Sequence, residues 1–503
     1  MSPSRPPMLA VGLLLAISSF AAHGSARAVS AQEPVGDRLP VREVVLDNGM
    51  TILVLPRGGA PTVSFVVRFG VGGVHEHLGT TGIAHLLEHL LFKGTTSIGT
   101  RDIDAERVLF ARMDAVQDTL LRARASGRAE RVPELEARID ALEDSARSYV
   151  VPNELDRILT EAGARGLNAT TSSEATTYFV ELPANRAELW FALEADRMTH
   201  PVFREFYSER DVVTEERRMR VDTDPAGLLY EQHLAAAFTM HPYGVPVVGY
   251  MSDLRALSRR DVEDYYRRFY GPNNAVVAVV GDIDPDQVEG WARRYFGGIP
   301  RGEVPPPVLA VEPPQRGERR VTVEWDAEPR LRIAWHVPAG VADEASAIAM
   351  LASVLTGGRT SRLYRRLVLD DQLVTGVYAS TGPGTLFPQL FQIDAVPRSG
   401  QPTERIESAI YDEIERLVRE GPDERELERV RSQVAAGNIR RMTSNLGLAF
   451  QIADSQALLG DWRETFRVSE RIAAVTPDQV RGIAALYLVL SNRTVAVLSR
   501  PES

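Results

Sequence analysis

The sequence predicts an α+β protein of two related domains, each a mainly antiparallel sheet packed against helices, with a helical hairpin inserted in the first. Three observations support this prediction. A proline-rich stretch, residues 300–314, divides the chain as interdomain linkers do. The two parts end in similar β-branched runs, residues 273–281 and 492–498. The segment before residue 85 also has a weak counterpart at 331–340, so two copies of one unit is the economical account.

The first 31 residues have the pattern of a signal peptide. Arg5 gives a thin positive start, an apolar run begins at Met8, and residues 29–31 form a small-x-small cleavage site, with 26–28 as the alternative. The apolar run is short for a membrane-spanning helix, although an uncleaved anchor is the competing interpretation. We therefore predict a periplasmic or secreted protein without a stable membrane span after cleavage.

The first domain, residues 32–299, begins with predicted strands. Residues 47–49, Asp-Asn-Gly, are a hairpin-turn signal between the apolar runs 44–46 and 51–55. A third strand is predicted over 62–69, where β-branched residues are frequent.

Residues 102–150 predict the helical insertion. Apolar side chains recur there at helical spacing: Leu109, Met113, Val116 and Leu120. Residues 126–128, Ser-Gly-Arg, interrupt the pattern and Pro133 opens a second helix. Alternating charges are typical of a solvated helical surface; a dedicated binding arm is the alternative.

Composition excludes several classes of protein. The chain has 503 residues, enough for about two to four domains, and a net charge of −11. This charge, with no basic cluster to offset it, argues against a nucleic-acid partner. The chain has no cysteine, so it has no disulfide framework, no thiolate metal site and no cysteine for a lipid anchor.

The sequence His85-Leu-Leu-Glu88-His89 predicts a metal site. On a helix, His85 and His89 lie one turn apart on one face, and Glu88 shares that face. Two imidazoles and an adjacent carboxylate supply two zinc ligands and a base for a bound water, in the inverted order of the His-Glu-x-x-His motif. The alternative is a chance pattern on an amphipathic helix.

A zinc held by two histidines needs a third protein ligand. The best candidates lie in residues 206–218, where Glu209 and Glu216 are two helical turns apart and can face the same way. Taken alone, this segment is an ordinary charged helix. His75 and His77 are near the motif, but their alternate spacing beside a glycine-rich loop is more typical of a surface.

Four segments together resemble the pitrilysin/insulinase family of inverted-motif zinc peptidases, in its processing-peptidase-like branch. They are residues 82–95, 168–172, 209–216 and 269–274. The resemblance spans most of the mature chain and is more specific in its first half. His89 and Glu216 are farther apart in sequence than the family usually shows, and the helical insertion accounts for the excess.

The resemblance implies a role for each candidate residue. His85, His89 and Glu216 would bind one Zn²⁺ per chain, Glu88 would be the general base of peptide hydrolysis, and Glu209 would orient a ligand histidine.

The resemblance also implies a substrate-binding edge strand. Asn168 and Ala169 would belong to it and pair with a peptide by β-augmentation. The competing interpretation of Asn168 is a turn residue before a strand.

The second domain, residues 315–503, is expected to be non-catalytic. In the family this part often contributes an Arg and a Tyr to the active site, and Val368 and Thr375 stand at the matching positions here; Arg365 or Tyr378 could be local substitutes. We therefore expect an exported zinc metalloendopeptidase that is the metal-bearing subunit of a heterodimer, with a related subunit supplying the pair. The alternative function is a non-catalytic scaffold subunit of a peptidase-like complex.

Overall fold

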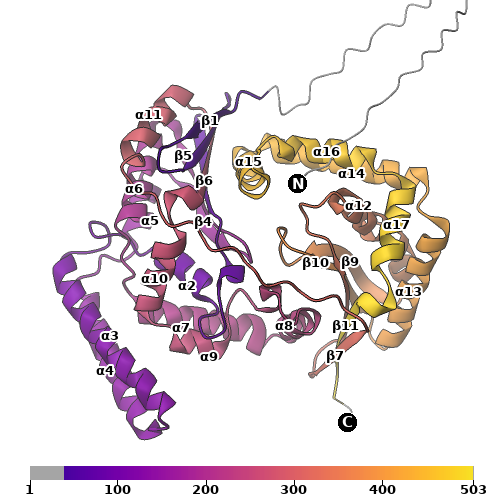
Figure 1. The fold of residues 1–503 in the computed structure, drawn as a ribbon, viewed down its shortest axis with the longest axis horizontal. Coiled ribbons are helices and arrows are strands. Elements are labelled where there is room, and N and C mark those ends of the chain that lie inside the picture. Colours follow the sequence, from indigo (N-terminus) through magenta and orange to yellow (C-terminus); the bar gives the residue numbers. More distant parts are fainter. Residues whose placement is uncertain (1–38, 502–503) are drawn as a thin grey trace, which may run out of the picture.

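The computed structural model describes residues 39–501, so the predicted signal peptide, residues 1–31, lies outside the described residues. Two sheets, each packed against helices, form the two halves of the molecule (Figure 1). This confirms the predicted α+β architecture. The strands of the two sheets fall on either side of residues 300–314, which contain no helix or strand.

The first sheet has six strands in the order β1-β2-β6-β3-β5-β4. β2 and β6 are parallel, and every other neighbouring pair is antiparallel. The predicted hairpin joins β1 to β2, with Gly49 at a φ of +91° in the turn. The bounds are β1 Arg42–Val45, β2 Thr51–Pro56, β3 Thr62–Phe69, β4 Arg165–Thr171, β5 Thr176–Pro183 and β6 Ala275–Gly281.

Side-chain alternation along these strands divides the core of the first half into two layers. On β3, Phe65 and Val67 point to the layer packed by helices of the first half, whereas Val66 points to the opposite face. The helices of the first half are α2 Ile83–Leu90, α5 Glu154–Glu161, α6 Ala187–Thr199, α7 Phe206–Arg217, α8 Pro225–Ala237, α9 Met251–Ala256, α10 Arg259–Phe269 and α11 Pro285–Tyr295.

The predicted insertion is confirmed as a helical hairpin. Its helices are α3 Ile103–Ala125 and α4 Val132–Arg147, and they project from the body of the first half (Figure 1). The hairpin is tied to the body by an ion pair between Asp114, in the middle of α3, and Arg259 and by hydrogen bonds from Ser208 to Glu143, near the end of α4.

The second sheet repeats this plan with five strands in the order β7-β11-β8-β10-β9, of which only β7 and β11 are parallel. The strands are β7 Arg319–Glu324, β8 Arg330–Val337, β9 Val374–Gly382, β10 Gln389–Pro397 and β11 Arg493–Ser499. The helices are α12 Ala345–Thr356, α13 Thr403–Glu420, α14 Glu424–Thr443, α15 Asn445–Leu459, α16 Glu464–Ala474 and α17 Pro477–Tyr487.

Each half contributes one helix to the other. α15 of the second half packs Leu448 and Ile452 against Leu53 and Val66 of the first sheet. In return, α8 of the first half packs Leu229 against Leu498 of the second sheet. Because each sheet is thereby covered on both faces, burial of apolar surface joins the halves.

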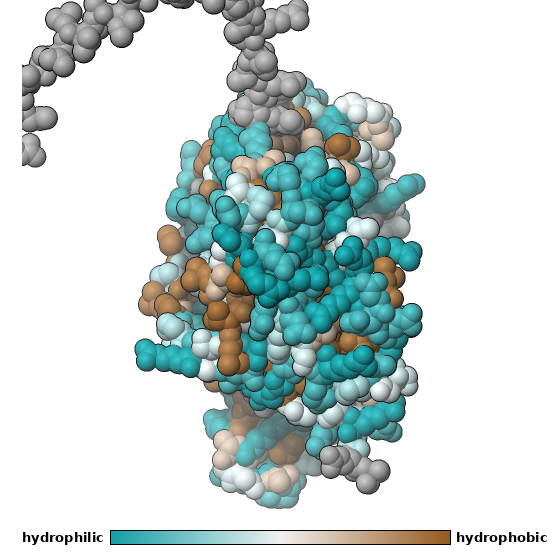
Figure 2. Space-filling model, turned by 90° about the vertical axis from the view of Figure 1, so that its right-hand side faces the viewer, coloured by the Kyte–Doolittle hydropathy of each residue, from teal (hydrophilic) through white to brown (hydrophobic). Residues whose placement is uncertain are grey.

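The outer face of the second half is predominantly hydrophilic, as Figure 2 shows from the side on which α13 and α17 lie in Figure 1. The sequence of α13 explains this for the surface that α13 contributes. Its apolar side chains lie on one side of the helix and are buried: Ile406, Ile410, Ile414 and Leu417. Within residues 39–501, no helix combines the length and apolar character needed to span a membrane.

Candidate metal centre

The helix α2 places two histidines side by side. Gly82, at a φ of +87°, precedes it, and the carboxylate of Glu76 accepts hydrogen bonds from the backbone N–H groups of Gly82 and Ala84, 2.8 and 2.9 Å away. These bonds fix the start of the helix. The imidazole rings of His85 and His89 then lie with their centroids 4.9 Å apart.

Glu216 on α7 completes a group of three ligand atoms. Its Oε2 lies 3.7 Å from Nε2 of His85 and 3.6 Å from Nε2 of His89. Among the described residues, this is the one group of three histidine or carboxylate side chains whose ligand atoms converge, all within 4.8 Å of one another. Tetrahedral zinc, bonded at about 2.0–2.1 Å, separates its ligand atoms by roughly 3.3 Å, so two imidazoles and a carboxylate at these distances fit zinc.

The electrostatics also suit a metal. Burial lowers the pKa of His85 to about 3, and the nearby positive charges of His89 and Arg220 act in the same direction. His85 is therefore neutral at physiological pH, and only a neutral imidazole can bind a metal.

Glu88 lies beside this group and is held by a strand. Thr171 Oγ1, at the end of β4, donates a hydrogen bond to Glu88 Oε2 over 2.5 Å. Burial raises the pKa of Glu88 above its ordinary value, against the lowering effect of this hydrogen bond. A carboxylate whose pKa is raised is suited to accepting and returning a proton near neutral pH.

Glu209 lies behind His89. Its Oε2 is 3.4 Å from His89 Nδ1, and its Oε1 is 2.6 Å from the ammonium nitrogen of Lys93. Burial acts to raise the pKa of Glu209, but the hydrogen bonds with His89 and Lys93 outweigh burial and lower it. The carboxylate is therefore ionised and can orient the imidazole of His89, whose Nε2 faces Glu216.

Glu216 has a partner of its own. The chain continues from α7 into a π-helical turn, Arg218–Asp222, in which Arg220 Nη2 lies 2.7 Å from Glu216 Oε1. One oxygen of Glu216 is thus paired with Arg220, and the other faces the two histidines.

Asn168 and Ala169 lie on β4, which pairs only with β5 and forms one edge of the first sheet. Ala169 is buried, whereas the side chain of Asn168 is exposed and accepts a hydrogen bond from the backbone N–H of Ala169. The strand reaches the centre at Thr171, so the open edge of the sheet and Glu88 adjoin.

Sequence reasoning missed three side chains of this centre. Thr171 and Lys93 belong to the segments that carried the family resemblance, but nothing in their spacing predicted contact with Glu88 and Glu209. Arg220 had no sequence signal, because its position depends on the π-helical turn. His75, by contrast, is not among the converging ligands and accepts a hydrogen bond from the backbone N–H of Gly72.

In the second half, Val368 is buried and Thr375 is exposed. Val368 lies in a π-helical turn, Tyr364–Asp370, and is packed in the core of the second half. Thr375 is exposed on β9 and donates its hydroxyl to the carbonyl of Val396. Tyr378, on the same strand, is 63% exposed.

Both halves of the chain match known protein families. The family described as Insulinase (Peptidase family M16) matches residues 53–107 and 145–250. The family described as Peptidase M16 inactive domain matches residues 256–434. The first match is interrupted over residues 108–144, which form most of the α3–α4 hairpin.

Relatives of this chain are named zinc proteases, and two of them match most of its length. Zinc protease PqqE of Helicobacter pylori is 26% identical over 430 residues, which are 83% of each chain. An uncharacterised zinc protease of Mycobacterium leprae is 25% identical over 481 residues, 92% of each chain.

Solved structures share the fold. A protease from Helicobacter pylori has a TM-score of 0.78 at 23% identity, over 92% of this chain and 99% of that one. The first half of the periplasmic protease PqqL from Escherichia coli has a TM-score of 0.66 at 17% identity, over 92% of both chains. The whole of PqqL gives the same score at 16% identity, but only 48% of it is covered. These structures share the fold, and the two family matches, which together span most of residues 53–434, show that the chain belongs to the insulinase family, peptidase family M16.

Proposed function

We propose that this protein is an exported zinc metalloendopeptidase that hydrolyses peptides or unfolded segments of proteins. The observation that carries the proposal is the convergence of His85, His89 and Glu216 beside Glu88. The zinc protease relatives support it, because they match most of the chain.

The chemistry follows from the positions of these residues. His85, His89 and Glu216 would hold zinc, which when bound would act as a Lewis acid and lower the pKa of a water. Glu88 accepts the proton of the attacking water and returns it to the leaving amine when the C–N bond breaks. Thr171 binds one oxygen of Glu88, and the second oxygen is left for this transfer.

The form of the substrate follows from the open edge of β4. An extended peptide can pair its backbone with this edge, as an added strand, and so lie across Glu88. A folded segment presents no free backbone for such pairing, so we expect selection for extended peptides, with Asn168 and Ala169 in the binding strand.

We further propose that the chain acts with a related subunit. Val368 and Thr375 provide neither a cation nor a phenol where other members have Arg and Tyr, and the hydroxyl of Thr375 is engaged with Val396. PqqL of Escherichia coli supports pairing, since this chain covers about half of it. Equal activity of the purified chain alone and of a co-expressed pair would contradict this partnership.

Export is the remaining part of the proposal. It rests on residues 1–31, and a periplasmic or secreted location is what we propose. Fractionation with N-terminal sequencing of the mature protein tests it, and an intact Met1 in the cytoplasmic fraction would contradict it.

The decisive experiment is Glu88→Gln in the full chain, assayed with any co-purifying subunit. We expect bound zinc to be retained and peptide cleavage to fall by about 10²–10⁴-fold. The matched control is Glu215→Gln, which changes an exposed glutamate on α7 paired with Arg218. A wild type that neither binds zinc nor cleaves peptides would instead support a scaffold subunit.

A further inference from the structure

Lys93 is the only lysine in the chain, against 56 arginines. Its side chain is 20% exposed and lies four residues after His89. An ammonium is a compact point charge with three donors, whereas a guanidinium is broad and planar. The single lysine of the chain therefore places the more compact of the two cations at this position.

The contacts of Lys93 lead directly to the metal centre. Its Nζ lies 2.6 Å from Glu209 Oε1 and 3.4 Å from Glu205 Oε2. The other oxygen of Glu209 lies 3.4 Å from Nδ1 of His89. The contacts therefore run from the ammonium of Lys93 through the carboxylate of Glu209 to the imidazole of His89.

The backbone of Lys93 is held by a second cation. Arg204, fully buried, donates hydrogen bonds to the carbonyls of Lys93, Thr95 and Ile98 at 2.6, 2.7 and 3.0 Å. Its charge is balanced by Glu106 in the first turn of α3, also fully buried. Three carbonyls on one rigid guanidinium leave the loop after α2 little freedom.

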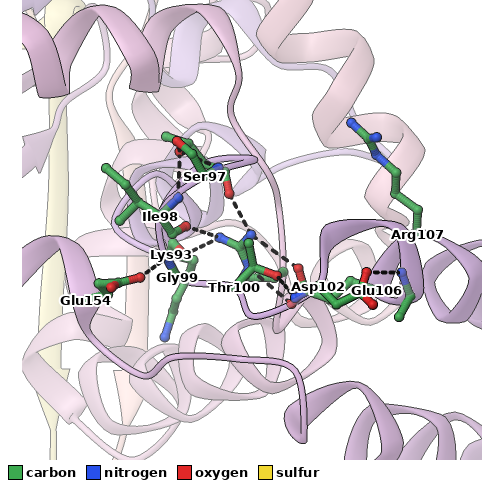
Figure 3. Close-up of polar contacts among 12 residues, drawn as sticks. Lys93, Ser97, Ile98, Gly99, Thr100, Asp102, Glu106, Arg107 and Glu154 are labelled. Carbon is green, nitrogen blue, oxygen red and sulfur yellow. Dashed lines mark hydrogen bonds and ion pairs between the residues drawn. The ribbon is translucent and has the colours of Figure 1, made fainter.

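Close packing also restricts the conformation of the loop after α2. Gly99 has a φ of +85°, and a Cβ there would lie 2.7 Å from the carbonyl oxygen of Lys93. Figure 3 shows Lys93 beside Ile98 and Gly99, with Glu154 accepting the hydrogen bond of the Gly99 N–H at 2.6 Å. The side chain of Lys93 therefore extends from a backbone that is held in place.

We propose that Lys93 is a positioning residue of the metal centre. Its ammonium holds the Glu209 carboxylate in the orientation that binds His89 Nδ1, which keeps His89 Nε2 turned towards Glu216 and the metal. This inference rests on the proposed function, since it requires zinc at His85, His89 and Glu216. It adds a residue that acts through Glu209 and touches neither metal nor substrate.

The test measures zinc affinity of the full chain by chelator competition, so it does not depend on a known substrate. Lys93→Met removes the charge and keeps the length; we expect zinc to bind about 10–100-fold more weakly. Lys93→Arg keeps the charge, and we expect an intermediate loss because the broad guanidinium displaces Glu209. Arg267→Met is the control, since Arg267 is exposed on α10 and pairs with Asp264; its affinity should equal that of the wild type.

A double-mutant cycle separates positioning from a general loss of stability. In a Glu209→Gln background, Lys93→Met should weaken zinc binding no further, because the carboxylate through which it acts is gone. Equal weakening in both backgrounds, or wild-type affinity of Lys93→Met, would overturn the inference. If Lys93→Met does not fold, the same cycle is run with Lys93→Arg.

Failure of the proposed function gives a different result. A wild type that binds zinc without cleaving peptides contradicts the peptidase proposal, but the double-mutant cycle of Lys93 and Glu209 can still be measured through zinc affinity. A wild type that binds no zinc at this site overturns both.

Discussion

A hydrogen bond between Thr171 and Glu88 connects the edge strand of the first sheet to the candidate metal centre. Thr171 Oγ1 donates its hydrogen to Glu88 Oε2 over 2.5 Å, although the two residues are 83 positions apart in sequence. A peptide that pairs with β4 therefore lies along the strand that also orients Glu88.

Thr171→Val, which keeps the shape and removes the donor, should lower turnover and leave zinc affinity unchanged. A hydrogen bond to a charged group contributes roughly 1.5–3 kcal/mol, so we expect a loss of about 10–100-fold in kcat. Steady-state kinetics and zinc titration measure the two quantities. The control is Thr170→Val on the exposed side of the strand; unchanged kcat in Thr171→Val would show that Glu88 is oriented by other contacts.

Zinc removal should lower thermal stability as well as activity. A ligand that binds only the folded state stabilises it by about 2.7 kcal/mol when present at 100 times its Kd. Calorimetry with and without a chelator should show a fall in Tm that added zinc reverses. His85→Ala should show no such response to zinc, and a response like that of the wild type would place the metal elsewhere.

Glu312 should make stability depend on acid pH. Burial acts to raise its pKa, but hydrogen bonds from the backbone N–H groups of Met240, Thr239 and His241 outweigh burial and hold the pKa below its ordinary value. Its contribution is therefore present above the unfolded pKa and is lost as pH falls through the folded pKa. Glu312→Gln should lower the free energy of unfolding by about 1–3 kcal/mol at pH 7, with a difference that shrinks in acid.

Urea unfolding of Glu312→Gln across pH measures this difference. Glu303→Gln, in the same proline-rich stretch, is the control because its side chain is exposed. A difference that stays constant from neutral to acid pH would contradict the assignment.

Arg204→Ala should be strongly destabilising. The substitution leaves Glu106 as an unpaired buried charge and leaves three carbonyls of the Lys93 loop without their donor. Breaking a buried ion pair costs about 3–5 kcal/mol. Thermal unfolding checks this against Arg107→Ala, which changes an exposed arginine of α3, the helix that carries Glu106. Similar Tm values for the two variants would refute the prediction.

Replacement of residues 108–144 by a short Gly/Ser linker should preserve the metal centre. The family match stops and resumes around this segment, and α3 and α4 pack mainly on each other. Loss of the Asp114–Arg259 ion pair, of the hydrogen bonds from Ser208 to Glu143 and of the buried side chains Phe110 and Met113 should lower Tm. Zinc affinity should be unchanged, and a large decrease would mean that the hairpin supports the centre.

Much of this structure is local and therefore readable in the sequence. The strands over 51–55 and 62–69, the hairpin turn at Gly49 and the helical insertion follow from residue periodicity and turn chemistry. The pairing of His85 with His89 is also local, because one helical turn brings them together. The two-sheet architecture was predicted because the parts of the chain before and after one proline-rich stretch end in similar runs.

The tertiary structure alone decided the rest. The family resemblance implied Glu216 and Glu209 as partners of the two histidines, but their contact exists because α7 packs beside α2. The contact of Thr171 with Glu88 had no signal in the sequence. The exchange of α8 and α15 between halves depends on which apolar faces meet, and hydrophobic burial has no direction that a sequence pattern can specify. The sequence determined which residues could bind zinc; packing between distant segments determined which side chains orient them.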